Sequence, residues 1–111
     1  PLTPESYLAD PYHEGYKEQM DFYAYLLQNM DFKVSETAYF LVCNADRRAD
    51  GFFGKMNFSE TIIPYKWNSD WISGKVSEMV DLINQTEVPE GNPSCNNCAY
   101  AMQRAVIETS L

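Results

Sequence analysis

The sequence predicts a mixed α/β (α+β) chain with the element order helix, strand, strand, helix, short helix, and a sheet completed by absent residues or by a dimer partner. Three observations carry this prediction. Apolar residues recur at helical spacing in two segments, residues 14–30 and 68–86. An unbroken apolar run lies between them, from Ala38 to Cys43. Turn-forming residues follow that run directly, which favours a hairpin.

The first helix is predicted from about Glu14 to Met30 and is expected to be largely buried. Its apolar residues form a wide stripe, made of Met20, Phe22, Tyr23, Ala24, Leu26, Leu27 and Met30. Residues 1–12 contain three prolines and no clear period, so we expect a loop or linker there that ends in a short helical turn.

The segment ETAYFLVCNA, residues 36–45, predicts a strand covered on both faces, because its apolar run is continuous and rich in β-favouring residues. Such a strand is expected at the centre of a sheet. The stretch ADRRADG then supplies turn chemistry through Asp46, Asp50 and Gly51. The next stretch, residues 52–65, alternates in part before Pro64 ends it, so the two segments predict an antiparallel hairpin.

A second amphipathic helix is predicted within residues 68–86, capped by Asn68, Ser69 or Asp70. Its helical spacing is carried by Ile72, Val76, Met79, Val80 and Ile83. Two prolines and a glycine then mark a loop over residues 89–93, and a short final helix is expected to begin near Asn96.

The composition indicates one globular domain, since 45% of the 111 residues are hydrophobic and 14% are aromatic. Sixteen acidic and eight basic residues give a net charge of -8, which excludes a general affinity for phosphate backbones. Any contact with nucleic acid is therefore local or supplied by absent sequence. No apolar run approaches the ~20 residues of a membrane span and no signal peptide is visible, so we expect a soluble, cytoplasmic protein with no membrane partner.

Two predicted strands are too few for a stable sheet without further strands or helix cover. The chain begins at Pro1, without methionine, so we expect that an earlier segment was removed or left out. The sequence therefore predicts either the second half of an α/β domain or a unit that dimerises to complete its sheet.

Gln19 and Tyr23 are four residues apart, so both lie on one stripe of the first helix. In an ordinary helix such a tyrosine is semi-buried and keeps its hydroxyl satisfied at the edge of the core. The alternative is a polar pair aimed into a functional site. Spacing alone does not decide between these two interpretations.

Taken in order, the Q-x-x-x-Y helix, the aliphatic strand, the second strand, the helix that begins with a tryptophan and the terminal PSCNNCAY resemble the carboxy-terminal half of the P-D-(D/E)-x-K nuclease superfamily, in its RecB-like and CRISPR-associated branch. The resemblance covers about residues 13–104. It implies that residues 1–12 are a linker and that residues 13–111 are the carboxy-terminal portion of one nuclease-like domain, with an incomplete restriction-endonuclease-like fold.

The resemblance implies metal-dependent hydrolysis of a DNA phosphodiester, with Mg²⁺ or Mn²⁺ held by carboxylates and a lysine that positions or activates the attacking water. Gln19 would help to orient that lysine and water, and Tyr23 would contact the DNA backbone. The metal-binding Asp and the (D/E)-x-K of the family do not precede Gln19, so the chain alone is expected to be inactive. Asp31-Phe32-Lys33 is a literal D-x-K, but it follows the helix that it should precede, and we interpret it as a solvated turn.

Cys95 and Cys98 form a C-x-x-C, which is the spacing of one half of a zinc or iron–sulfur site. Further cysteines complete an iron–sulfur cluster in related nucleases, whereas the only other cysteine here is Cys43. Three alternatives remain open: reduced structural thiols, a metal site completed by absent or partner residues, and a redox pair.

His13 is interpreted as a surface residue. Arg47 and Arg48 either belong to a solvated, charge-balanced loop or contact DNA phosphates, a role that suits arginine. Trp67 and Trp71 flank the start of the second helix and are expected to anchor it on the sheet.

Two other functions fit the sequence. The first is an acidic, non-catalytic protein-interaction module, dimeric in form, which the net charge of -8 and the incomplete sheet suggest. The second is a small metal-binding domain that uses Cys95 and Cys98.

Overall fold

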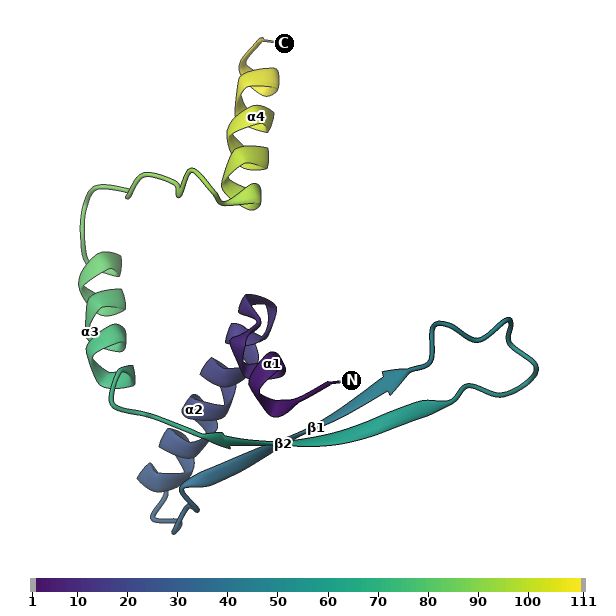
Figure 1. Cartoon of the computed structure of the whole chain (residues 1–111). Coiled ribbons are helices and arrows are strands. Elements are labelled where there is room, and N and C mark those ends of the chain that lie inside the picture. Colours follow the sequence, from purple (N-terminus) through teal and green to yellow (C-terminus); the bar gives the residue numbers. More distant parts are fainter. Residues whose placement is uncertain (1, 111) are drawn as a thin grey trace. The chain divides into compact units, whose positions relative to one another are not determined.

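The chain forms four α-helices, one short 3-10 helix and two strands within residues 2–110, the part that this computed structural model describes (Figure 1). The elements are α1 (Pro4–Ala9), η1 (Pro11–His13), α2 (Glu14–Asn29), β1 (Thr37–Ala45), β2 (Phe58–Lys66), α3 (Ile72–Ile83) and α4 (Asn96–Ser110). The chain divides into two compact units, Pro1–Val76 and Ser77–Leu111. The predicted α+β class is confirmed at this coarse level.

Residues 4–9 form helix α1, where the sequence suggested a loop. The Thr3 hydroxyl accepts a hydrogen bond from the Ser6 N–H at 3.2 Å, and the Ser6 hydroxyl accepts one from the Thr3 N–H at 3.1 Å. This capping box satisfies two donors that the helix leaves free. The prolines were misleading because Pro4 and Pro11 each stand at the start of a helical segment, where no N–H is required.

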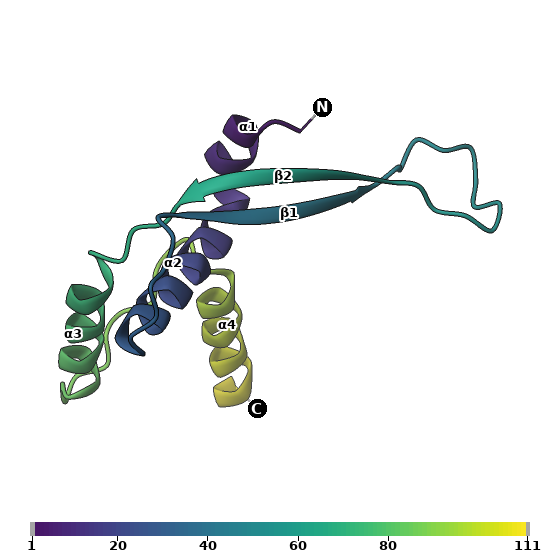
Figure 2. The ribbon, with the colours of Figure 1, turned by 90° about the horizontal axis from the view of Figure 1, so that it is seen from below.

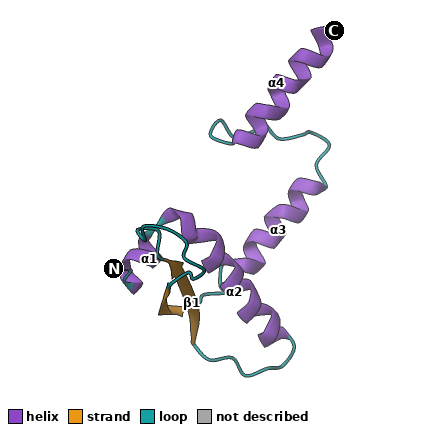
Figure 3. Cartoon of the chain, turned by 90° about the vertical axis from the view of Figure 1, so that its right-hand side faces the viewer, coloured by secondary structure: helices purple, strands orange, loops and turns teal. Residues whose placement is uncertain are grey.

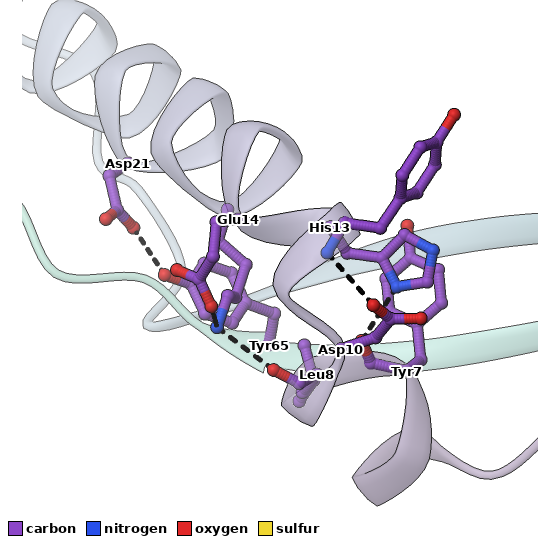
Figure 4. A network of polar contacts seen from close by, with 9 residues as sticks. Tyr7, Leu8, Asp10, His13, Glu14, Asp21 and Tyr65 are labelled. Atoms are coloured by element: carbon purple, nitrogen blue, oxygen red, sulfur yellow. Dashed lines mark hydrogen bonds and ion pairs between the residues drawn. The ribbon is translucent and has the colours of Figure 1, made fainter. Parts of the chain in front are cut away.

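Tyr7 fixes α1 against the hairpin. Its side chain is buried, and its ring stacks on His13 with centroids 3.8 Å apart and tilts against Phe40 of β1 at 5.7 Å. The His13 Nδ1–H donates to the Tyr7 carbonyl at 2.8 Å, as Figure 4 shows. Burial, followed by the proximity of Tyr16, raises the pKa of the Tyr7 hydroxyl. His13 is therefore half-buried and connects α1 to the start of α2 through its contacts with Tyr7, whereas the sequence predicted a surface residue.

Lys17 ties the start of α2 to the end of α1. Its ammonium group donates to the Leu8 carbonyl at 3.0 Å and pairs with the Glu14 carboxylate at 2.6 Å. The last carbonyls of a helix have no partner within the helix, so a cation at this position stabilises the end of α1.

Helix α2 matches the predicted first helix in extent but is not largely buried. Asp21 and Ala24 are its buried residues, whereas Tyr23, Leu26 and Leu27 are exposed. The side of α2 that meets β2 carries Asp21, whose carboxylate accepts a hydrogen bond from the Tyr65 hydroxyl. The apolar stripe is therefore covered in part, at Ala24, Met20 and Phe22, whereas the exposed residues Tyr23, Leu26, Leu27 and Met30 remain open within the part of the chain that the structure describes.

Strands β1 and β2 pair antiparallel from Thr37↔Lys66 to Ala45↔Phe58, which confirms the predicted hairpin (Figure 2). The second strand begins at Phe58, later than the expected Phe52. Pro64 lies inside β2 and does not end it. A proline is tolerated there because an edge strand has one side on which no ladder bond is lost.

The hairpin has one covered face and one open face. Its register places Phe40 opposite Ile63 on the first face and Leu41 opposite Ile62 on the second. Ile63 is 0% exposed, whereas Leu41 and Ile62 are 63% and 64% exposed. Within residues 2–110 the sheet has only these two strands, so the expectation of a central strand covered on both faces is wrong for this part of the chain.

Helix α3 confirms the predicted second helix, and α4 begins at Asn96 as expected but is longer than predicted (Figure 3). Ile72 is fully buried at the start of α3, and its N–H donates to the Ser69 carbonyl at 3.1 Å. No residue from 77 to 110 is buried. None of the helices within residues 2–110 combines the length and the hydrophobicity needed to cross a membrane.

Candidate functional site

The predicted pair Gln19 and Tyr23 is brought together on the outer face of α2. The Gln19 Nε2–H donates to the Tyr23 hydroxyl at 2.8 Å. Both side chains are exposed, Tyr23 by 54% of its surface. The pair is therefore not core filler within the described residues, and the interpretation of Tyr23 as a semi-buried helix residue is wrong. The Tyr23 hydroxyl can still donate its own hydrogen, because it accepts from Gln19 through a lone pair.

Asp21 clamps the opposite side of α2. Each residue turns an α-helix by about 100°, so Asp21 is rotated by about 200° from Gln19. Its Oδ1 accepts hydrogen bonds from the Tyr65 hydroxyl at 2.9 Å and the Asn68 N–H at 3.0 Å, and its Oδ2 accepts one from the Trp71 indole N–H at 2.8 Å. Figure 4 shows Asp21 of α2 reaching the Tyr65 hydroxyl on β2. The carboxylate therefore joins α2 to the end of β2 and to the turn before α3.

This clamp also sets the electrostatics of Tyr65. Burial, the hydrogen bond to Asp21 and the negative charges of Asp21 and Glu14 raise the pKa of the Tyr65 hydroxyl far above its ordinary value of 10.0. The phenol is therefore held as a neutral donor to the carboxylate. A charged acceptor strengthens each hydrogen bond, and Asp21 is only 5% exposed, so water does not compete for it.

Asp21 was not singled out from the sequence, although a signal was present. It lies between Met20 and Phe22, three residues before the buried Ala24, so it occupies the buried stripe of the helix. A carboxylate in such a position needs strong partners.

The two tryptophans have different partners from those expected. Trp71 donates to Asp21 and packs edge-on against Phe22, with ring centroids 5.5 Å apart, so it anchors the start of α3 on α2 and not on the sheet. Trp67 donates from its indole N–H to the Ser35 carbonyl at 2.6 Å and so fixes the loop before β1.

The D-x-K at Asp31 and Lys33 lies in the turn that ends α2. Asp31 has a φ of 65°, its N–H donates to the Gln28 carbonyl at 3.0 Å, and the Phe32 N–H donates to the Leu27 carbonyl at 3.1 Å. This is the Schellman arrangement of a helix end. Both charged side chains are exposed, as the interpretation of a solvated turn predicted.

Arg47 and Arg48 lie in the exposed loop between β1 and β2. The Arg48 N–H donates to the Asp46 carboxylate at 2.9 Å, which shapes the beginning of the loop. Neither guanidinium group forms a hydrogen bond or an ion pair with another residue in the described range 2–110. Both groups are therefore available to an anionic ligand.

Cys95 and Cys98 meet at the start of α4, whereas Cys43 lies exposed on β1. The Cys98 N–H donates to the Cys95 sulfur at 3.2 Å. Hydrogen bonds from the Cys98 thiol, from the Cys98 N–H and from the Asn97 N–H lower the pKa of the Cys95 thiol, against a smaller opposing effect of desolvation. Cys95 thus stands directly before α4 and takes the place of a capping residue, because its sulfur accepts a hydrogen bond from the Cys98 N–H.

The described residues do not by themselves fit a closed metal site. Among residues 2–110 no three side chains of His, Cys, Asp or Glu converge on one point. Two thiols supply half of a tetrahedral zinc site, and Gln19 and Tyr23 supply no carboxylate for Mg²⁺ or Mn²⁺.

The fold and the site together define an α+β protein that presents a hydrogen-bonded glutamine and tyrosine on the open face of a clamped helix. No protein-family model, no curated protein and no solved structure matches this chain. The likeness to the nuclease superfamily rests on the residue pattern alone.

Proposed function

We propose that this chain is the carboxy-terminal portion of a P-D-(D/E)-x-K nuclease-like protein that hydrolyses DNA phosphodiester bonds. The observation that carries the proposal is the exposed Gln19–Tyr23 pair, with its side chains 2.8 Å apart on the open face of α2. The pair faces outward, so the remaining hydrogen-bonding groups of both side chains are open to a ligand. The exposed apolar residues of the same helix, Leu26, Leu27 and Met30, fit a further layer of the domain.

In this proposal the residues that bind the divalent metal lie outside residues 1–111. The metal would supply charge stabilisation and an activated water. Gln19 is a positioning residue, because its amide has one more N–H and one carbonyl oxygen to offer to a neighbouring lysine or water. Tyr23 uses its hydroxyl hydrogen to bind a phosphate oxygen of DNA. Asp21 keeps both side chains in place because it fixes the orientation of α2 against β2 and α3.

The proposal is tested with DNA and Mn²⁺ in two arms. The chain of 111 residues alone is expected to leave plasmid and linear DNA intact. The product of the whole reading frame is expected to carry an Asp and a (D/E)-x-K upstream of Pro1 and to cleave DNA only when the metal is present. Metal-dependent cleavage by the short chain would contradict the proposal, and so would a reading frame without these residues.

A second function, an acidic protein-interaction module, is favoured by a different observation. The open face of the hairpin exposes Tyr39, Leu41 and Ile62, each by more than 60%. Apolar patches of this kind mark interaction surfaces. Sedimentation equilibrium of the chain separates the cases, since a monomer that melts cooperatively counts against an obligate partner.

A further inference from the structure

The loop between β1 and β2, residues 46–57, has features that the function proposed above does not use. We call it the hairpin tip. It is closed at its neck by a hydrogen bond from the Asp46 N–H to the Asn57 carbonyl at 2.8 Å. The chain bends at Gly54, where φ is +75°, a conformation that favours glycine. Figure 2 shows the tip extending beyond the paired strands.

Two large apolar side chains of the hairpin tip, Phe52 and Phe53, are exposed to solvent. Phe52 and Phe53 are 72% and 85% exposed. A Cβ on Gly51 would lie 3.3 Å from the Phe53 ring, so the end of this ring lies close to the Gly51 backbone while most of the side chain stays exposed. Aromatic rings offered to water in this way, on a loop, are typical of a binding surface.

The charge of the tip differs from that of the chain. Three basic residues, Arg47, Arg48 and Lys55, stand against Asp46 and Asp50, which gives the tip a net charge of +1 in a chain of net charge -8. The available guanidinium groups therefore stand out against an otherwise acidic protein. An anionic ligand is attracted to this place and repelled elsewhere.

Two hollows meet at Asp46, and their linings divide the tip chemically. One, of about 600 Å³, is lined in part by Phe52, Phe53, Met56 and Lys55. The other, of about 780 Å³, is lined in part by Arg47, Arg48, Ser59 and Thr61. Both volumes are in the range of small-ligand sites. The first hollow offers the rings of Phe52 and Phe53, the second offers the guanidinium groups of Arg47 and Arg48, and the Asp46 carboxylate lines both.

From this arrangement we propose that the hairpin tip binds single-stranded DNA, with bases stacked on Phe52 and Phe53 and phosphates bound by Arg47 and Arg48. Bases present their flat faces only when they are unstacked, so a duplex offers nothing to the two rings. Phenylalanine has no hydrogen-bonding group to read a base edge, so the site is tolerant of sequence. The inference rests on the proposed function for the identity of DNA as the ligand, and it adds a preference for single strands.

The test is fluorescence anisotropy of the whole chain with a labelled oligothymidine of about 12 nucleotides, a length suited to one such site. The single strand is expected to bind at least ~10-fold more tightly than a duplex of the same length. The two arginines predict a slope of about -1.4 for log affinity against log salt concentration, since each phosphate bound in a single strand contributes about -0.7.

Variants then separate stacking from other causes. Phe52→Ala with Phe53→Ala is expected to weaken binding of the single strand by ~10-fold or more, whereas tyrosine at both positions retains it because the ring is kept. Tyr100→Ala is the matched control, since Tyr100 is an exposed ring on α4, and it is expected to leave affinity unchanged. Circular dichroism confirms that each variant is folded.

Several results would overturn the inference: no binding, equal affinity for duplex and single strand, or an unchanged affinity in the double alanine variant. Binding to vesicles of phosphatidylcholine and phosphatidylserine in place of DNA would assign the tip to membranes, and ring-dependent self-association would assign it to a second copy of the chain. The nuclease proposal fails separately, because its readout is metal-dependent cleavage by the longer gene product and not binding by the tip.

Discussion

Replacement of Asp21 by alanine is expected to be among the most destabilising single changes in the Pro1–Val76 unit. The substitution removes one acceptor group and leaves three donors, on Tyr65, Asn68 and Trp71, without their partner. A hydrogen bond to a charged group contributes about 1.5–3 kcal/mol, and the values within one cluster are not additive. We therefore expect a loss of about 3–5 kcal/mol, a large part of the roughly 5–15 kcal/mol that is typical of a whole domain.

The assay is urea unfolding followed by circular dichroism and by tryptophan fluorescence, since Trp71 bonds directly to Asp21. Asp21→Asn is expected to cost less, about 2 kcal/mol, because one oxygen remains but the new NH₂ group faces a donor. Glu18→Ala is the control, an exposed carboxylate on the same helix, and is expected to change stability by less than about 0.5 kcal/mol.

A loss below about 1 kcal/mol for Asp21→Ala would refute this reasoning, because it would show that the three donors find other partners at little cost. A loss of unfolding free energy equal to that of Glu18→Ala would refute it in the same way. In either case the orientation of α2 would have to be fixed by packing alone.

Three other predictions follow from the geometry. Asp31→Gly is expected to raise the free energy of unfolding, measured by urea titration, by about 0.5–1.5 kcal/mol. The glycine adopts the positive φ of 65° without strain, and the substitution removes a negative charge from the C-terminus of α2. A destabilised variant would contradict the assigned turn. The raised pKa of Tyr65 adds stability that is fully present below pH 10.0, the ordinary pKa of the group, and that is lost as the pH rises above it. The free energy of unfolding is therefore expected to fall more from about pH 9 to pH 11 in the wild type than in Tyr65→Phe. Parallel pH profiles of the two proteins would exclude this linkage. The lowered pKa of Cys95 predicts that iodoacetamide at neutral pH modifies it before Cys43, as read by peptide mass spectrometry, and earlier modification of Cys43 would count against the capping geometry.

The elements that the sequence predicted well have strong periodic or turn signals. The amphipathic pattern over Ile72–Ile83 and the turn chemistry after β1 fixed a helix and a hairpin in the right places. Local rules worked there because the residues involved are close in sequence. The start of α1 was missed because proline breaks a helix when it lies in the interior but is favoured at the first helical position. Only the capping box of Thr3 and Ser6 shows that Pro4 begins a helix here.

Burial was predicted less well, because it depends on which residues distant in sequence come together. The apolar run of β1 fits a buried strand and an edge strand equally, and the register with β2 reveals that Leu41 lies on the open face. For the site, four-residue spacing placed Gln19 beside Tyr23 correctly. It did not reveal Asp21, whose partners on β2 and before α3 are 44 to 50 residues away in the sequence.

The most direct test of the central claim is the rate of metal-dependent DNA cleavage by the longer gene product with Gln19→Ala, compared with Gln28→Ala as an exposed glutamine on the same helix. We predict that Gln19→Ala lowers the rate by about 10-fold or more, as expected for the loss of a positioning group, and that Gln28→Ala leaves it unchanged. Equal rates for the two variants and the wild type would contradict the assignment of the α2 outer face to a phosphodiesterase site.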